Sequence, residues 1–527
     1  MRRRATVCIA LDACDPALAR AFAATGAMPN LARLLDEAAC CTVINPFGLF
    51  VGALWVSFAT ALRPARHGFH CWDRIDPATY ERQLNPPRLS QFSSFWKLMS
   101  DAGCRVAAID VPHRQAVERL NGLEVSEWGC HDRHFGLHAS PSAVADEIEM
   151  TYGVHPVLGP GARTPREFAP DDWVHRKGRY RTLAEEKALL RDLCAGAETK
   201  QRMTLDLLGR EQWDFLVSVF GESHAIGHQQ WHLHDPDHPR FDSKAAAAVG
   251  GDPLERVYGV LDAALGAVAA RVPNEALFLV HLSHGMGPHY DATHMLDEIL
   301  TRLGRVEDGH HASNSFADRA KRAVGPLLAP LGRIARAVAI PAELRALVRR
   351  RIAVQEHATP QARARQRFFS EPNNSVYGGI RFNLAGREPN GCVRPDEIEA
   401  LSAQLEADFL AIRDAKTGEP MVRAIIPCAL HHERRSDDTM PDLLVEWNRH
   451  RQVATVISPK IGMVHAPYQG WRTGDHSPDG LLLARGPGLP AATDLPPLAI
   501  EDIGPTVAAR LGVTLDGVDG RPAEWSA

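Results

Sequence analysis

The chain has 527 residues, of which 45% are hydrophobic and 23% are charged, and its formal net charge is -5. These values are ordinary for a compact globular protein and exclude a disordered or fibrous chain. The small net charge gives no strong field for attracting nucleic acid, and no apolar stretch approaches the roughly 20 residues that a membrane-spanning helix needs.

The N-terminal segment and the cysteines predict a cellular compartment. A basic start, Met1 to Arg4, precedes an apolar run that Asp12 and Asp15 interrupt, which would break the core of a signal peptide. The 10 cysteines never occur with C-x-x-C spacing, and most lie in apolar segments, as reduced and buried thiols do. A cysteine-based zinc site is therefore improbable. We expect a cytoplasmic protein without a membrane span.

Short apolar runs, each followed by a turn signal and a helical pattern, recur along the chain. Strands that alternate with helices form a mostly parallel sheet covered by helices on both faces, so we expect an α/β fold. A late helix is also expected near Asp502 to Thr506, with Pro505 in its first turn. We expect the strands of one central sheet at residues 5–11, 42–45, 105–109, 215–220, 277–282, 443–447 and 481–484.

A segment of different composition interrupts this pattern. Residues 304–370 are rich in Ala, Arg and Leu, carry prolines, and show no strand signal. Within it, residues 319–367 contain twelve Arg or Lys but only two acidic residues. The sequence therefore predicts a basic helical insertion, or cap, at 304–370 in a core formed by 1–303 and 371–527. For Arg349 to Arg351 we favour a solvated helix face over a patch that binds an anionic partner.

Histidines gather where the predicted strands end. Asp12 closes the first strand, His224 and His228 follow the run that ends at Phe220, and His284 follows the run that ends at Leu282. His476 precedes the last strand. Ligands of open α/β sheets bind beyond the carboxyl ends of the strands, which makes these side chains the candidate site.

The spacing of His224 and His228 suits one metal ion, because residues four apart lie on the same face of a helix. Imidazole and carboxylate ligands favour zinc, and a third protein ligand would leave a fourth position for water or substrate. The alternative is chance, since the chain contains 25 histidines. Spacing alone leaves both interpretations open.

A serine hydrolase is a second possibility. Gly221 to Ala225 follows a strand and differs by one residue from the G-x-S-x-G nucleophile elbow, with Ser223 as the nucleophile and His284 or His476 as its base. Ala occupies the fifth position, however, and no HGGG-type oxyanion segment is present. Phosphate-loop and dinucleotide-binding motifs are also absent from the sequence.

Taken in chain order, the motifs resemble the type I phosphodiesterase/nucleotide pyrophosphatase branch of the alkaline-phosphatase superfamily. The resemblance covers nearly the whole chain outside 304–370. The segment from Trp55 to Gly68, for example, is similar to that family's "W-x-S-x-x-T-G-x-x-P-x-x-H-G". The other matching segments are Leu11-Asp12, Gly26 to Leu31, Ser283-His284-Gly285, Gly474-Asp475-His476 and Asp502 to Thr506.

The resemblance implies a phosphate site with two zinc ions, to which Asp12, His228, His284 and His476 correspond as ligands. Two further ligand positions differ, because His224 and Ser283 stand where the family has Asp. We therefore expect one three-histidine zinc site formed by His224, His228 and His476. The second site keeps Asp12 and His284 but too few charged donors for tight binding, so we expect it to be weak or empty.

The family's nucleophile is missing as well. The position expected nine residues before Thr60 is Val51, and residues 43–56 contain no Ser, Thr or Cys. Ser57 and Thr60 belong to the following helix and face away from the expected point of attack. The resemblance then implies a single-zinc hydrolase or transferase that acts on a phosphate, foremost a phosphodiester, or on a sulfate ester without the covalent intermediate.

In this interpretation the partner is a small-molecule ester, and Asp12 and His284 orient the anion or act as acid and base. The competing interpretation is a non-catalytic member of the superfamily that binds a phosphorylated ligand or partner.

Other polar residues receive weaker assignments. His131, Asp132, His134 and His138 form a histidine-rich loop that we expect to be solvated. Arg381 and Arg387 lie in a segment similar to the family's "Y-G-x-I-R-x-N-x-x-G-R-E-P", where ion pairing is the default and anion binding the alternative. His289 and Tyr290 are candidates for shaping access of the substrate.

Overall fold

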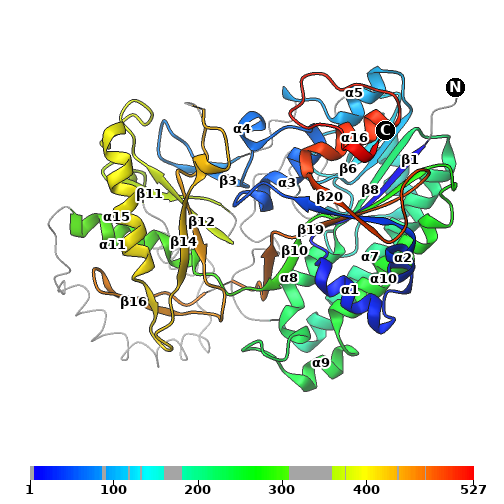
Figure 1. Ribbon diagram of the computed structural model, residues 1–527. Helices are drawn as coiled ribbons and strands as arrows, with labels where there is room; N and C mark the ends of the chain where they lie inside the picture. The colour runs from blue at the N-terminus through cyan, green and yellow to red at the C-terminus, as the bar shows by residue number, and fades with distance from the viewer. Residues whose placement is uncertain are drawn as a thin grey trace.

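The computed structural model describes residues 5–85, 91–116, 119–130, 133, 135–159, 181–307, 359–373, 376–435, 438–468 and 470–526. In Figure 1 these residues form a larger lobe that contains both chain ends and a smaller lobe built from the middle of the sequence. The candidate site lies in the larger lobe, on the side that faces the smaller one.

A mostly parallel sheet forms the centre of the larger lobe, as the sequence predicts. Its strands are β1 (Thr6–Leu11), β2 (Ala39–Ile44), β5 (Val106–Ile109), β6 (Gly122–Ser126), β7 (His138–Ser140), β8 (Phe215–Phe220), β9 (Leu277–Leu282), β19 (Gly480–Arg485) and β20 (Thr493–Ala499). The spatial order is β20-β2-β19-β9-β1-β8-β5-β6-β7. Strands β9, β1, β8, β5 and β6 run parallel. Strand β19 runs antiparallel to both of its neighbours, and β7 runs antiparallel to β6.

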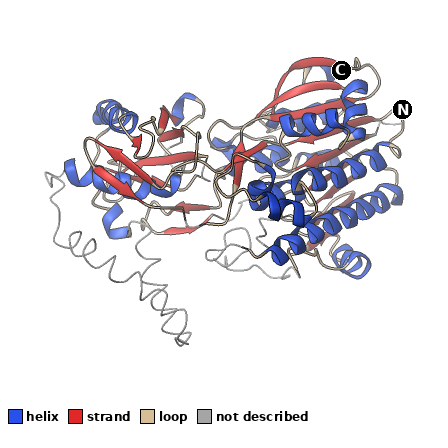
Figure 2. Ribbon diagram, turned by 90° about the horizontal axis from the view of Figure 1, so that it is seen from below, coloured by secondary structure: helices blue, strands red, loops and turns tan. Residues whose placement is uncertain are grey.

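Helices cover both faces of this sheet because its central strands are apolar on both sides. Val7, Ile9 and Leu11 of β1 face one helical layer, whereas Cys8 and Ala10 face the other. The first layer contains α1 (Pro16–Thr25), α2 (Pro29–Glu37), α6 (Ala143–Tyr152), α7 (Leu183–Arg210), α8 (Glu222–His234) and α10 (Pro253–Ala269). The second contains α3 (Phe50–Thr60), α5 (Phe95–Asp101) and α16 (Ile503–Arg510). Figure 2 shows helices running alongside the strands of this lobe.

The smaller lobe has its own antiparallel sheet, with the order β11-β12-β15-β14, and its own apolar core. Its strands are β11 (Phe368–Glu371), β12 (Tyr377–Phe382), β14 (Val422–Pro427) and β15 (Leu443–Trp447), and helices α11 (Leu296–Glu307) and α15 (Ile398–Leu410) lie in the same lobe. The expectation that residues 443–447 complete the central sheet is therefore wrong. An apolar run shows that a strand is buried but not in which sheet it lies.

Short elements complete the described structure. Strands β10 (Gly285–Pro288) and β18 (Gly474–Ser477) pair with each other between the lobes. The remaining elements are β3 (Asp73–Ile75), β4 (Arg82–Leu84), β13 (Arg413–Asp414), β16 (Thr455–Ser458), β17 (Gly462–His465), α4 (Pro64–His67), α9 (Ser243–Val249) and α14 (Pro360–Arg363).

Most of the predicted basic insertion, including Arg349 to Arg351, lies outside the described residues. Only the two ends of the segment are described. The first end belongs to α11, which continues past residue 304, and the second contains α14 and the start of β11. Strand β11 begins at Phe368, so the expectation of no strand up to residue 370 is wrong by one short strand. The division of the chain into a core and an insertion stays a prediction.

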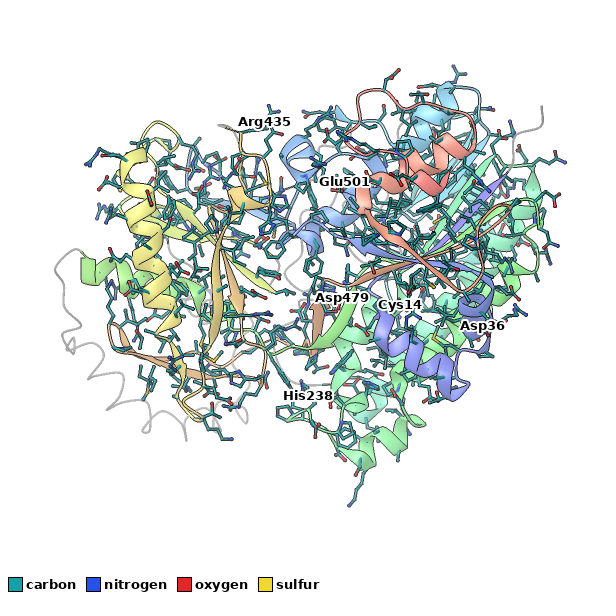
Figure 3. All side chains as sticks on the ribbon, viewed as in Figure 1. Cys14, Asp36, His238, Arg435, Asp479 and Glu501 are labelled. Carbon is teal, nitrogen blue, oxygen red and sulfur yellow. The ribbon has the colours of Figure 1, made fainter. Side chains whose placement is uncertain are left out.

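The cysteines are all free, and eight of the ten are buried. Cys14, which follows β1, lies inside the larger lobe (Figure 3). Burial raises the pKa of the Cys8 thiol to about 12, so this group stays protonated at neutral pH. Within the described parts of the chain, no helix combines the length and the apolar composition needed to cross a bilayer.

Candidate metal centre

Three neighbouring strands bring the candidate residues to one level of the central sheet. In the parallel register, Leu11 of β1 lies beside Phe220 of β8 and Leu282 of β9. The residues that follow, Asp12, Gly221 and Ser283, therefore leave the sheet together. The sequence predicts this meeting correctly, because parallel strands end at the same edge.

Helix α8 begins directly after β8 and carries the first two histidines. His224 and His228 lie one turn apart on it, and their side chains are only 4% and 1% exposed. Strand β18 then approaches α8 closely, because Gly474 has no side chain at the contact. A Cβ atom on Gly474 would lie 2.3 Å from the carbonyl oxygen of Gly227. This close approach places His476 beside the two helical histidines.

The three imidazoles converge through their Nε2 atoms. The Nε2 of His228 lies 3.2 Å from that of His224 and 3.1 Å from that of His476. One ligand nitrogen from each ring falls within 4.8 Å of the others, and all three residues are buried. Two bonds of about 2.0 to 2.1 Å at a tetrahedral angle separate the ligand nitrogens of a zinc ion by roughly 3.3 Å. The spacing of the rings therefore fits a zinc ion.

The tautomer of His228 fits the same role. Its Nδ1 lies 2.8 Å from the carbonyl oxygen of Gly474, which can only accept, so Nδ1 carries the proton and donates it. The neutral ring then turns the lone pair of Nε2 toward the other two imidazoles. Backbone carbonyls orient metal-ligating histidines in this way.

Asp12 and His284 lie next to this centre, but Asp12 is held by hydrogen bonds. Its Oδ1 accepts from the indole Nε1 of Trp55 at 2.8 Å and from Ser283 Oγ at 3.2 Å. His284 Nε2 lies 3.9 Å from the same oxygen, and its ring centre lies 4.4 Å from that of His476. The structure thus brings all five predicted residues together. Trp55 is a partner of Asp12 that the sequence did not predict.

The first turn of α3, where the resemblance expects the nucleophile, has no hydroxyl side chain. Phe50 and the half-buried Val51 occupy its first turn, and the Phe50 ring centre lies 5.6 Å from that of His284. The hydroxyls farther along the helix are engaged elsewhere. Ser57 Oγ lies 2.9 Å from His67 Nε2, and Thr60 Oγ1 donates to the carbonyl of Val56. Both residues are fully buried.

Ser223, the nucleophile of the rival serine hydrolase, also has a structural contact. Its Oγ donates to the backbone carbonyl of Asp12 at 2.6 Å, and the side chain is fully buried. A triad serine would instead share its hydroxyl proton with an imidazole. The geometry therefore disfavours this mechanism.

The remaining polar candidates separate into different groups. His131, Asp132 and His134 lie outside the described residues. The Nε2 of His138, in β7, accepts from the backbone N–H of Ala116 at 2.8 Å, so this side chain has a structural contact. Tyr290 is buried, and its part in substrate access stays a prediction.

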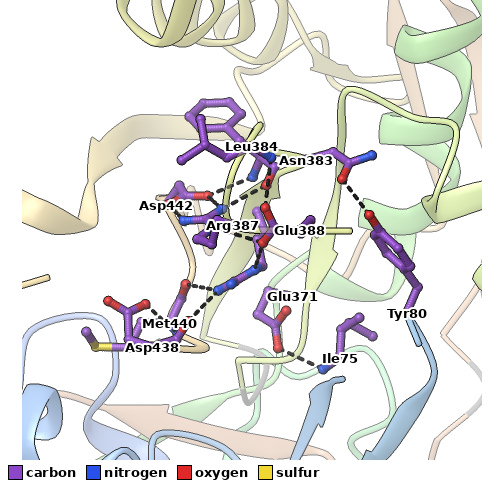
Figure 4. A network of polar contacts seen from close by, with 12 residues as sticks. Ile75, Tyr80, Glu371, Asn383, Leu384, Arg387, Glu388, Asp438, Met440 and Asp442 are labelled. Atoms are coloured by element: carbon purple, nitrogen blue, oxygen red, sulfur yellow. Dashed lines mark hydrogen bonds and ion pairs between the residues drawn. The ribbon is translucent and has the colours of Figure 1, made fainter. Parts of the chain in front are cut away.

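Arg381 and Arg387 form ion pairs, which agrees with the default interpretation. Figure 4 shows the pair of Arg387 with Asp442. Arg381 Nε lies 2.8 Å from Glu388 Oε1, and Arg387 donates to both oxygens of Asp442 at 2.7 Å. The four side chains lie in the smaller lobe and link the end of β12 to the segment before β15.

A buried carboxyl next to this network yields a prediction about pH. Glu371, in β11, is 2% exposed and its Oε1 accepts from the backbone N–H of Ile75 at 3.0 Å (Figure 4). Burial raises the pKa of Glu371 to about 8, although nearby Arg381 opposes the shift. Between about pH 4.5 and pH 8 the Glu371 carboxyl is protonated in the folded protein and ionised in the unfolded chain. Its contribution therefore lowers the free energy of unfolding as the pH rises through this range.

The substitution Glu371→Gln should remove that dependence. We expect the free energy of unfolding of the wild-type protein to fall, relative to the variant, by roughly 2 to 4 kcal/mol between pH 5 and pH 8. Urea denaturation at both pH values measures the difference. Glu298→Gln, which changes an exposed carboxylate on α11 paired with Arg302, is the control and should follow the wild-type profile. Parallel profiles for the wild-type protein and Glu371→Gln would contradict the assignment.

The sequence did not predict one further cluster. His289, Asp291 and Asp475 are buried and bring one potential ligand atom each within 4.8 Å of the others. The H-x-D spacing at 289–291 is visible in the sequence, but two residues do not define a metal site. The third member, Asp475, comes beside them only through the fold of β18.

Comparisons with known proteins identify the family. Residues 6–479 match the family described as type I phosphodiesterase / nucleotide pyrophosphatase. No curated protein matches the chain significantly. Two of the similar solved structures are phosphonoacetate hydrolase from Sinorhizobium meliloti 1021 and murine ectonucleotide pyrophosphatase / phosphodiesterase 5. The first shows 13% identity over 97% of this chain and 96% of that chain, with a TM-score of 0.48. The second shows 10% identity over 100% and 99%, with a TM-score of 0.46. The match over nearly the whole chain shows that this protein belongs to the type I phosphodiesterase / nucleotide pyrophosphatase family.

Proposed function

We propose that this chain is a zinc-dependent hydrolase of small phosphate esters, foremost phosphodiesters, or of sulfate esters, and that it works without a covalent intermediate on the protein. The observation that carries the proposal is the convergence of His224, His228 and His476 beside a helix start that lacks a hydroxyl. Family membership supports phosphoester hydrolysis as the reaction class.

The three histidines would hold the ion and leave one coordination position open. Bound there, zinc supplies Lewis acidity and lowers the pKa of a coordinated water toward ~7. These properties replace the activation that a Thr or Ser nucleophile would otherwise require.

His284 is the group placed to move a proton. Its Nδ1 lies 3.2 Å from the carbonyl of Gly285, which fixes the proton on that atom and leaves Nε2 to accept one from the attacking water. Asp12, 3.9 Å from Nε2, stabilises the imidazolium that forms. Trp55 and Ser283 hold the Asp12 carboxylate in place during this step.

The same two donors support a single metal ion. Oδ1 of Asp12 accepts hydrogen bonds from Trp55 and Ser283, which compensate its charge where the family's second zinc would bind. We therefore infer that the second site is weak or empty. The free, mostly buried cysteines further support a reducing, cytoplasmic location.

A screen of substrates tests the function. Metal-stripped full-length protein is assayed with a bis-aryl phosphodiester, an aryl phosphomonoester and an aryl sulfate, before and after addition of one equivalent of zinc. We expect hydrolysis of at least one ester that depends on zinc and is lost in His224→Ala. Zinc binding without turnover of any ester would instead favour the second candidate, a non-catalytic member that binds a phosphorylated ligand. The replaced nucleophile and Asp ligand positions favour that candidate.

Covalent labelling separates the proposal from a serine mechanism. Because the hydroxyls of Ser223, Ser57 and Thr60 are buried and hydrogen-bonded, we expect a fluorophosphonate probe to label none of them in the folded protein. Intact-mass spectrometry after incubation measures the adduct, and an active serine hydrolase incubated in parallel is the control for probe reactivity. An adduct on Ser223 of the folded chain would overturn this expectation.

A further inference from the structure

The cluster of His289, Asp291 and Asp475 lies where the paired strands β10 and β18 meet the smaller lobe. His289 directly follows β10, Asp475 belongs to β18, and the backbone N–H of His289 donates to Thr473 just before that strand. His289 Nε2 lies 2.8 Å from Asp291 Oδ2 and 3.4 Å from Asp475 Oδ2. Their side chains are 6%, 3% and 0% exposed, so water contributes little to their solvation.

Backbone contacts aim all three side chains at one point. Oδ1 of Asp291 accepts from the N–H of Thr293 at 2.8 Å, and Oδ1 of Asp475 accepts from the N–H of His476 at 2.8 Å. Each carboxylate is thereby fixed with its Oδ2 turned toward His289. The Nδ1 of His289 lies 3.4 Å from the carbonyl of Arg472, which places the proton of the neutral ring on that side. Its Nε2 then faces two carboxylate oxygens, and against the effect of burial both carboxylates raise the pKa of His289, so this point of the structure attracts positive charge, which a metal ion can supply in place of a proton.

We propose that these three residues bind a divalent cation, zinc or manganese, at a site separate from the three-histidine centre. One imidazole nitrogen and two carboxylate oxygens are a ligand set that both ions accept, and the two negative charges match a divalent ion. The three ligand atoms lie within 4.8 Å of one another, which is close enough for one ion to contact all of them. Burial of two carboxylates side by side favours positive charge next to them.

The position of the site on β18 gives it a structural consequence. Asp475 and His476 are consecutive residues of one strand, so their side chains point to opposite faces. The two centres therefore lie on either side of β18 and share no ligand. A cation at His289, Asp291 and Asp475 ties the segment after β10 to this strand, which carries the third histidine of the catalytic centre.

Metal content after reconstitution tests the site. Full-length wild-type protein, Asp291→Asn and His228→Ala are stripped with a chelator, loaded with Zn²⁺ or with Mn²⁺, desalted, and measured by inductively coupled plasma mass spectrometry. We expect Asp291→Asn to hold about one equivalent less than the wild-type protein for at least one of the two ions. Asp262→Asn, which changes a buried carboxylate that accepts from the N–H of Leu31, is the matched control and should keep the wild-type content.

The variants separate this site from the proposed catalytic centre. Loss of metal in Asp291→Asn but not in His228→Ala would support this site while removing the three-histidine centre. Loss in His228→Ala with an unchanged content in Asp291→Asn would overturn this site and leave the catalytic proposal standing. If circular dichroism shows that Asp291→Asn does not fold, His289→Gln takes its place in the same comparison.

Discussion

Replacement of His228 by alanine is expected to remove zinc from the catalytic centre and to abolish zinc-dependent ester hydrolysis. The side chain supplies the Nε2 that lies within 3.2 Å of both partner nitrogens, so its loss leaves two ligands where a catalytic zinc needs three. Removing a mere hydrogen-bonding partner of a metal ligand costs 10- to 100-fold in affinity or activity, so removing the ligand itself should cost more than about 100-fold. Zinc affinity and kcat/KM measured on the same preparations test both parts.

His232→Ala is the matched control for this prediction. His232 lies one turn farther along α8, is buried, and contacts Thr473 just before β18, but it is not among the three converging histidines. Burial, with nearby Arg240, lowers its pKa to about 3, so the substitution removes a neutral ring and no charge. We expect this variant to keep its zinc. Equal zinc affinity and activity in His228→Ala and the wild-type protein would refute the assigned ligand set.

Replacement of Lys200 by methionine is expected to destabilise the larger lobe by about 3 to 5 kcal/mol. Lys200, on α7, is fully buried, forms an ion pair with Asp110 at the end of β5, and donates to the carbonyl of Val219 at 3.1 Å. Without the ammonium group, the Asp110 carboxylate would stay buried with only the N–H groups of Trp128 and Gly129. Denaturation in guanidinium chloride measures the loss.

A double variant shows whether the uncompensated charge is the cause. Lys200→Met with Asp110→Asn removes both charges, so it should recover much of the stability lost in the single variant. Arg191→Met on the same helix changes an exposed cation paired with Asp192 and should leave the unfolding midpoint unchanged. An unfolding midpoint of Lys200→Met equal to that of the wild-type protein would show that the pair contributes nothing to stability.

The central sheet and the three-histidine centre could be predicted from the sequence because both follow from local patterns. The runs that become β1, β8 and β9 are mostly apolar, and residues of the site follow each of them within a few positions. The helical spacing of His224 and His228 also follows from sequence. His476 is a candidate from its place before the last strand, but only the family resemblance assigns it to the same ion, because spacing along the chain does not show which strand will approach α8.

The features that the sequence did not predict depend on contacts between residues far apart in the chain, or on residues that rarely occur in strands. Strand β20 contains two adjacent prolines, which argue against a strand. It lies at the edge of the sheet, where a proline does not remove a hydrogen bond between two interior strands. Strand β15 looks like a strand of the central sheet but pairs with β12 and β14. The contact of Trp55 with Asp12 joins residues 43 positions apart.

These contacts also bear on the proposed change at the second metal position. Where the family has an Asp ligand, this chain has Ser283, whose Oγ donates to Asp12 and accepts from the N–H of Ala13 at 3.0 Å. Trp55 adds a second donor to the same carboxylate. These hydrogen bonds to Oδ1 support our proposal that the second metal position is weak or empty, and that the three histidines form the zinc centre.

Anomalous diffraction at the zinc edge from crystals of zinc-loaded protein tests the central claim most directly. The account predicts an anomalous peak at about 2.0 to 2.1 Å from the Nε2 atoms of His224, His228 and His476. It predicts a weak peak or none between Asp12 and His284. A strong peak at Asp12 and His284 with no density among the three histidines would contradict it.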